Sequence, residues 1–235
     1  MGSGAPATRS VAQLVLLDNR FSVMPKVVAE GRRVIANIER VAALFLTKNV
    51  LSLLLSLCVA IARWPYPFLP RQVTLVSTLA IGLPGFFLAL GPNSRRFEPG
   101  FVRRVLAFAI PAGAVTAAAV MTAYSLVRAE GVEVDRARTA ATIVFLMASL
   151  AVLAVRSRPL RRWKAALVAS MVALGPLAFV LPPARAFFEL RLPGAPATVV
   201  AVMLGLAAVA GIAMVARLTT RLAGRGHDRA TTALP

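Results

Sequence analysis

The chain has 235 residues, of which 58% are hydrophobic and 15% are charged, and its mean hydropathy is +0.76. Soluble domains usually contain about 45–50% apolar and about 25% charged residues, so this composition excludes an ordinary soluble domain and favours a protein in a lipid bilayer. The formal net charge is +18, but the basic residues form short clusters between apolar runs, which is typical of loops that flank membrane helices. We therefore expect the bilayer, and no nucleic acid, as a partner.

Residues 1–40 have the composition of a soluble segment. Val11–Leu17 is short and rich in branched residues, which predicts a buried strand, and the turn signal Asp18-Asn19 follows it. Phe21, Met24, Val28 and Ile35 then recur at spacings that are typical of one face of a helix. The sequence therefore predicts a small folded piece over residues 1–20 and a helix over residues 21–40.

Six apolar segments follow, each of about 17–23 residues. This length is enough to cross a hydrocarbon core of about 30 Å, because a helix rises about 1.5 Å per residue. The fifth segment is the least regular, because three prolines crowd its end. We predict an all-α membrane protein with six transmembrane helices within residues 41–216 and a tail over residues 217–235. The segments are 41–62, 73–91, 105–127, 137–155, 165–181 and 197–216.

The distribution of lysine and arginine predicts the orientation. The N-terminal arm carries six of these residues, the second loop four, the fourth loop five and the tail four, whereas the first, third and fifth loops carry two, three and two. Cytoplasmic loops carry the excess of basic residues. We therefore expect a multi-pass protein of the plasma membrane with both termini in the cytoplasm.

The first apolar segment holds one ionisable residue, Lys48. All nine acidic residues lie outside the six segments, so a cation site there would use hydroxyls, amides, carbonyls or helices from elsewhere. An ionisable group in hydrocarbon is a candidate for function, but Lys48 could equally extend to the cytoplasmic interface. Its neighbours Asn49 and Ser52 share a helix face, where they either line a polar seam or hold helices together.

The second segment contains a predicted break. Pro84 removes a backbone donor, and the glycines Gly82 and Gly85 permit local unwinding. Broken helices near the middle of the membrane are common cation sites in transporters, although a packing kink is the alternative. We expect no catalytic residue, and the sequence leaves any metal ligand undetermined. The candidate cation pathway comprises Lys48, Asn49, Ser52, Ser77, Thr78, Gly82 and Pro84.

The first half of the chain resembles one family of ion pumps. The turn Met1-Gly-Ser-Gly4, followed by a segment that ends in Val15-Leu-Leu-Asp18, is similar to the end of the phosphorylation domain of P-type cation-transporting ATPases. Phe21 to Asn37 resembles the stalk that enters the fifth membrane helix of that family, and Asn49-Val50 matches a dipeptide of that helix. Pro67 to Pro84 resembles the next loop and the sixth helix. Among subfamilies, the chain looks most like the actinobacterial cation-transporting ATPase E group.

This resemblance implies that the six segments are the fifth to tenth helices of an ATP-driven cation pump, with calcium as a candidate ion. The phosphorylated aspartate, the nucleotide-binding and actuator domains and the first four helices would precede Met1. ATP and Mg²⁺ would bind to that preceding part, which is then a partner of this chain, as is the transported cation. The chain alone would hold no cofactor and would neither bind ATP nor become phosphorylated.

The chain also departs from the family pattern. Calcium pumps of the family carry Glu at the position of Ser52, and Asn and Asp at the positions of Ser77 and Ile81, so the resemblance leaves the ion open. The alternative function is a free-standing six-helix transporter or scaffold without ATPase activity. The predicted strand over residues 11–17 argues against it, because such a strand would have no sheet to join.

Overall fold

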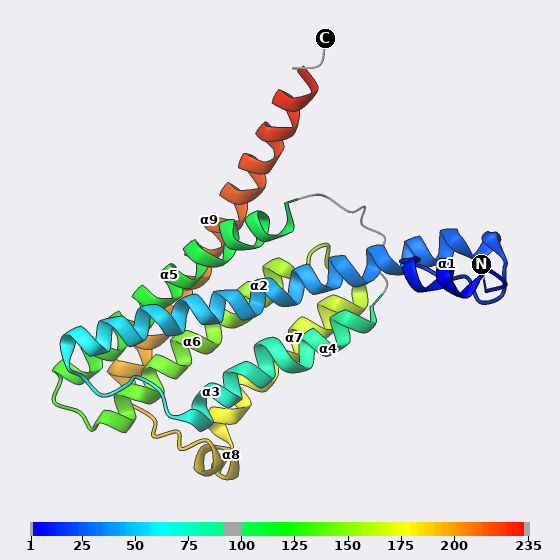
Figure 1. Cartoon of the computed structure of the whole chain (residues 1–235). Coiled ribbons are helices and arrows are strands. Elements are labelled where there is room, and N and C mark those ends of the chain that lie inside the picture. The colour runs from blue at the N-terminus through cyan, green and yellow to red at the C-terminus, as the bar shows by residue number, and fades with distance from the viewer. Residues whose placement is uncertain (1, 92–99, 233–235) are drawn as a thin grey trace.

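The computed structural model describes residues 2–91 and 100–232, with side chains as far as residue 221. Within these ranges the chain folds into helices and contains no strand (Figure 1). Six helical stretches are long and apolar enough to cross a membrane, one over each predicted segment. The prediction of an all-α protein with six transmembrane helices is confirmed. The stretches are α2 (Met24–Ala62), α3 (Pro70–Ser77) with η2 (Thr78–Gly82) and α4 (Leu83–Leu90), α5 (Phe101–Ala129), α6 (Val134–Arg156), α7 (Arg162–Val180) and α9 (Ala195–Thr232).

The predicted strand over residues 11–17 is wrong. Residues Pro6–Val11 form the short helix α1, and residues 12–17 have no regular structure. Two hydrogen bonds close the arm on itself. The backbone N–H of Gly2 donates to Leu16 O, and the backbone N–H of Ser3 donates to the side-chain Oδ1 of Asn19. A strand needs a neighbouring strand to satisfy its backbone groups, and the described part of the chain supplies none.

The stalk and the first span are one continuous helix. A single 3₁₀ turn, η1 (Phe21–Val23), precedes α2, which then runs for 39 residues to Ala62. Pro25 lies in the first turn, where its missing N–H costs no helical hydrogen bond. Arg63 ends the helix in the left-handed conformation that commonly terminates helices. A movement of residues 24–40 would therefore reach the membrane span without an intervening hinge.

The transmembrane helices pack closely in a bundle, with α2 on α5, and α5 on both α6 and α9. Packing in a bilayer depends on van der Waals contact, which small residues favour. Gly113 of α5 illustrates this, because a Cβ added there would lie 2.7 Å from Val50 Cβ and 2.9 Å from the carbonyl oxygen of Thr47. The short helix α8 (Pro182–Phe187) lies in the connection after α7.

At one end of the bundle, which we call the stalk end, polar side chains of α2 hold the ends of other helices. Asn37 Nδ2 donates to Ala89 O (2.9 Å) and Arg33 donates to Leu90 O (2.7 Å), both at the end of α4. The Glu39 carboxylate pairs with Arg104 of α5 (3.2 Å) and lies 3.9 Å from Arg156 of α6. The stalk end therefore gathers the start of α5 and the ends of α4 and α6 around the stalk.

The opposite end, which we call the loop end, joins the first, third and fifth loops. The buried Gln72 donates to Glu189 O (3.2 Å) and accepts from Thr142 (3.2 Å). Tyr124 donates to Pro65 O (2.9 Å) and Arg138 donates to Tyr66 O (3.1 Å). The odd-numbered loops thus share one end, as the alternating topology requires. Part of the orientation count falls outside the described residues. This part comprises Arg95 and Arg96 in the second loop and the side chains of Arg225 and Arg229 in the tail.

The predicted tail over residues 217–235 is helical as far as it is described. Helix α9 continues without interruption from Ala195 to Thr232, so the last span and residues 217–232 form one helix. Figure 1 shows this extension projecting beyond the other helices. The side chains of its last part, from residue 222, lie outside the described residues.

Candidate functional site

Lys48 and Ser77 meet inside the helix bundle. Lys48 lies on α2 and is partly buried, and its Nζ donates to the Ser77 Oγ at 2.8 Å. Ser77 is the last residue of α3, directly before η2. The lysine ammonium therefore ends against the second span, and in this structure it does not extend to the stalk end.

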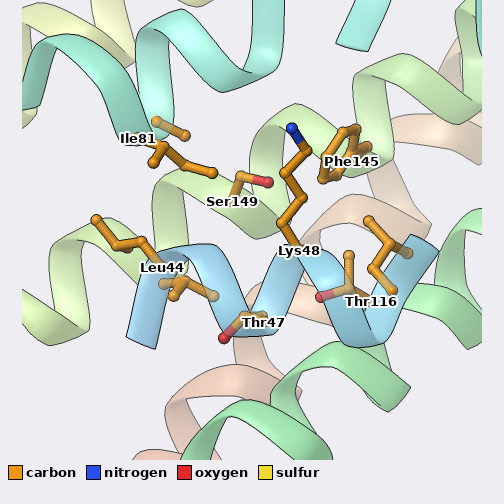
Figure 2. A pocket seen from close by; sticks show the side chains of 10 residues that line it. Leu44, Thr47, Lys48, Ile81, Thr116, Phe145 and Ser149 are labelled. Carbon is orange, nitrogen blue, oxygen red and sulfur yellow. The ribbon is translucent and has the colours of Figure 1, made fainter. Parts of the chain in front are cut away.

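A small cavity of about 20 Å³ lies beside this contact. That volume holds about one water molecule. Figure 2 shows the Lys48 side chain rising from α2 between Ser149 and Phe145, with Ile81 across the cavity. The lining residues come from α2, η2, α5 and α6: Leu44, Thr47, Lys48, Leu51, Ala80, Ile81, Thr116, Phe145, Ser149 and Val152.

Three hydroxyl groups line the cavity together with the ammonium. Thr47 donates to Ala43 O (2.7 Å) and Thr116 donates to Ala112 O (2.8 Å), each one turn back on its own helix. Their oxygen lone pairs stay available as acceptors. The Ser149 hydroxyl forms no hydrogen bond with any residue of the described ranges. The cavity therefore offers oxygen atoms that can accept from a water or contact a cation, but no carboxylate.

The predicted break in the second span takes the form of a π-helical turn. The backbone N–H of Leu83 bonds to Thr78 O, five residues back, and Pro84 has no N–H with which to restore the tighter α-helical pattern. Single π turns widen a helix locally and are frequent at functional sites. Here the turn is wider than an α-helix but not unwound, and it places Ala80 and Ile81 at the cavity.

The other predicted pathway residues lie apart from this cluster. Asn49, Thr78 and Gly82 are exposed on the outside of the described bundle, Ser52 is partly buried, and Pro84 is buried in α4. The sequence did not single out Thr116 or Ser149, because a single hydroxyl residue in an apolar segment does not indicate whether its side chain faces the bundle interior or the lipid. Only the packing of α5 and α6 against α2 brings these two hydroxyls to Lys48.

The chain has close relatives among calcium-transporting ATPases, although no protein-family model matches it. It is 45% identical over 238 residues to the calcium-transporting ATPase CtpE of Mycobacterium bovis. The matched region covers 95% of this chain and 30% of the relative. The CtpE protein of Mycolicibacterium smegmatis is also 45% identical, over 89% of this chain and 28% of the relative. A probable cation-transporting ATPase, exp7 of Streptococcus pneumoniae, is 39% identical over 47% of this chain.

The chain belongs to the P-type cation-transporting ATPase family. It matches the C-terminal part of the CtpE group and spans about 30% of the length of these relatives. The predicted resemblance is thereby confirmed. Because six helices are long and apolar enough to cross a bilayer, the chain is a multi-pass membrane member of this family.

The described part of the chain does not fit the family's nucleotide chemistry. Binding of Mg²⁺ with ATP uses carboxylates that are held close together, and the described residues contain no group of three His, Cys, Asp or Glu side chains able to hold a metal. Asp18 is the sole acidic residue among residues 2–20.

Two of the three positions at which the chain departs from the calcium-pump pattern lie at the cavity, whereas Ser52 lies apart from it. Ser77 holds the Lys48 ammonium, and Ile81 is 6% exposed and lines the cavity. Where the family pattern has an amide and a carboxylate, this chain therefore presents one hydroxyl and one apolar side chain. The local charge comes from Lys48 and is positive.

Proposed function

We propose that the chain is the translocation part of an ATP-driven cation pump, and that the cation path passes the Lys48–Ser77 contact. The family membership and the six membrane helices support a role in transport. The observation that carries the proposed path is a partly buried ammonium, held 2.8 Å from a hydroxyl beside a π turn, in a cavity with three further hydroxyls. ATP and Mg²⁺ would act on other parts of the intact pump.

Lys48 and a transported cation cannot occupy the cavity at the same time. Two positive charges about 4 Å apart repel each other by about 4 kcal/mol at an effective dielectric constant near 20, and the cavity of about 20 Å³ is too small to separate them. In this proposal the ammonium leaves Ser77 when a cation enters, and it returns when the cation leaves.

The names of the relatives favour calcium as the ion. Calcium takes six to eight oxygen ligands, usually with several carboxylates. The cavity supplies the hydroxyls of Thr47, Thr116 and Ser149 and no carboxylate. If calcium is the substrate, we expect most of its ligands to come from helices of the pump that this chain does not include.

The same proposal assigns a role to each segment of the chain outside the membrane helices. Residues 1–20 would be a remnant of the phosphorylation domain, residues 21–40 the stalk that passes its movement to the membrane, and residues 217–235 a cytoplasmic tail. The excess of basic residues at the stalk end supports a cytoplasmic position for that end and for both termini. The membrane would be the plasma membrane.

Two measurements in the source organism test this proposal. Deletion of the coding region of this chain should abolish ATP-dependent ⁴⁵Ca²⁺ uptake into everted membrane vesicles, and uptake that is unchanged for calcium and for other cations would contradict a pumping role. An immunoblot with an antibody against the C-terminal tail should show a band several times larger than 24.8 kDa. A band at 24.8 kDa would favour a free-standing six-helix protein.

A further inference from the structure

The first turns of α5 carry an open groove that the proposed cation path does not use. Its volume is about 970 Å³. It is mostly apolar, and Val102 and Ile110 expose 61% and 53% of their surface. Ala107 is also exposed and has only a methyl side chain. The described lining residues are Gly100, Phe101, Val102, Arg103, Leu106, Ala107, Ile110 and Pro111.

One end of this groove is positively charged. Arg103 is exposed and forms no ion pair with any residue in the described ranges, whereas the neighbouring Arg104 is paired with Glu39 at 3.2 Å. The first turn of α5 contains no acidic residue and no side-chain cap. The charge of Arg103 is therefore not compensated by its own helix, and the rest of the groove is apolar.

The charge lies at the level where lipid headgroups would be. Arg104, the next residue, lies at the stalk end with Glu39. From there the groove follows α5 into its membrane span, toward Ile110 and Pro111. A cation at the interface followed by an apolar track matches the shape of a phospholipid, since arginine binds phosphate oxygens in a bidentate manner.

We propose that this groove binds an anionic phospholipid, with the headgroup phosphate on the Arg103 guanidinium and one acyl chain along Leu106, Ala107 and Ile110. Basic pockets between membrane helices on the cytoplasmic side bind anionic lipid headgroups, and a zwitterionic headgroup offers the arginine no net negative charge. The inference rests on the membrane position of the chain and not on the identity of the pumped ion.

Native mass spectrometry of the full chain in mild detergent tests whether the charge of Arg103 selects an anionic lipid. The chain is mixed with equal amounts of phosphatidylglycerol and phosphatidylcholine that carry the same acyl chains. One basic residue near a membrane surface contributes about 1 kcal/mol, so we expect retention of phosphatidylglycerol to exceed that of phosphatidylcholine by about fivefold. Arg103→Gln should remove this preference. Arg158→Gln changes another exposed arginine, which lies outside the groove, and should keep it.

A second variant tests the groove itself. Ala107→Phe would fill the apolar track without changing charge, and we expect it to lower the retention of both lipids by several-fold. Ala107 and Arg103 are both exposed, so far-UV circular dichroism should show unchanged helix content in both variants. Equal retention of the two lipids by the unmodified chain, equal losses in Arg103→Gln and Arg158→Gln, or normal retention in Ala107→Phe would each overturn the proposal.

Discussion

Lys48 introduces a positive charge into the apolar, membrane-spanning part of α2, and its surroundings explain how the bundle tolerates it. A lysine near the centre of a bilayer costs about 2.5–3.5 kcal/mol on insertion scales. A hydrogen bond to a charged donor returns about 1.5–3 kcal/mol, and the Ser77 hydroxyl supplies one at 2.8 Å. The insertion cost and the hydrogen-bond energy are of similar size, so the position of the ammonium depends on whether the Ser77 hydroxyl is available to accept.

Replacement of Lys48 should affect transport more than folding. In the intact pump we expect Lys48→Met to lower ATP-dependent cation uptake by about tenfold or more, because the loss of about 1.5 kcal/mol of a specific interaction corresponds to that factor. The amount of pump in the membrane should stay within about twofold. Lys26→Met, at an exposed position of the stalk, is the matched control. Normal uptake by Lys48→Met would show that the lysine has no part in the cation path.

Replacement of Ser77 should lower stability instead. Ser77→Ala leaves the Lys48 ammonium without its hydroxyl acceptor, and we expect a loss of about 1.5–3 kcal/mol in the free energy of unfolding. The exposed neighbour Thr78 offers the control Thr78→Ala, which should change stability by less than about 0.5 kcal/mol. Thermal unfolding in detergent, followed by circular dichroism, compares the two. Equal effects would indicate that the 2.8 Å contact adds no stability.

At the scale of single elements, the contact between α2 and α5 depends on a residue without a side chain. A Cβ at Gly113 would approach Val50 Cβ at 2.7 Å and the backbone oxygen of Thr47 at 2.9 Å. Gly31, in the stalk part of the same α2 helix, has no neighbouring atom within 4 Å of an added Cβ. The two glycines therefore serve different purposes, and alanine substitution separates them.

Gly113→Ala should destabilise the bundle by about 1–3 kcal/mol, because the two helix backbones must move apart to accept the methyl group. Gly31→Ala should be neutral or stabilise the chain by as much as about 1 kcal/mol, since alanine favours a helix more than glycine does. The unfolding midpoint of each variant in detergent measures the difference. The opposite order would mean that α2 and α5 are not in close contact.

One carboxylate of the stalk lies against two other helices of the bundle. Glu39 is only 17% exposed and lies between Arg104 of α5 and Arg156 of α6. Glu30, nearer the start of the same helix, is 59% exposed and pairs with Arg33 of its own helix. An exposed pair of this kind contributes about 0–1 kcal/mol, whereas a shielded carboxylate between two arginines contributes more because water screens it less.

Glu39→Gln should therefore lower the free energy of unfolding by about 1–3 kcal/mol, and Glu30→Gln by less than about 1 kcal/mol. In the intact pump, Glu39→Gln should also slow transport, because the stalk would be less firmly attached to α5 and α6. Chemical unfolding and vesicle uptake measure the two effects. If both glutamine variants unfold alike, the Glu39 cluster does not hold the stalk in place.

At the scale of the whole molecule, the two ends of the bundle differ in charge. The stalk end gathers residues of the basic N-terminal arm, the start of α5 and the end of α6, whereas the acidic residues Glu133, Asp135 and Glu189 lie at the loop end. Each of these three carboxylates is within 4 Å of an arginine. These carboxylates offset part of the basic charge of the loop end, whereas the stalk end keeps a larger basic excess, which agrees with the proposed orientation.

Labelling of single cysteines tests that orientation. Cys58 is the single cysteine of the chain, so a Cys58→Ser background permits one new cysteine at a time. We expect an impermeant maleimide to label Glu130→Cys on intact cells and to leave Arg9→Cys unlabelled until the cells are opened. Labelling of Arg9→Cys on intact cells would place the N-terminus outside and reverse the proposal.

The sequence by itself determined the number of spans, the class of fold and the family. These depend on local information, namely the length of apolar runs and short motifs such as Asn49-Val50. The break at Pro84 was also predictable, because the missing N–H of proline acts on its own helix. The predicted strand over residues 11–17 was wrong, because a strand forms only where a partner strand exists.

The tertiary structure alone decided which polar side chains face one another. Lys48 and Asn49 are adjacent in sequence, yet Lys48 reaches Ser77 whereas Asn49 is exposed. Thr116 and Ser149 join the same cavity from two other helices. A helix turns about 100° per residue, so the face that each residue presents depends on how α2, α5 and α6 are rotated and aligned. Close packing between distant segments sets that alignment, and no local pattern in the sequence encodes it.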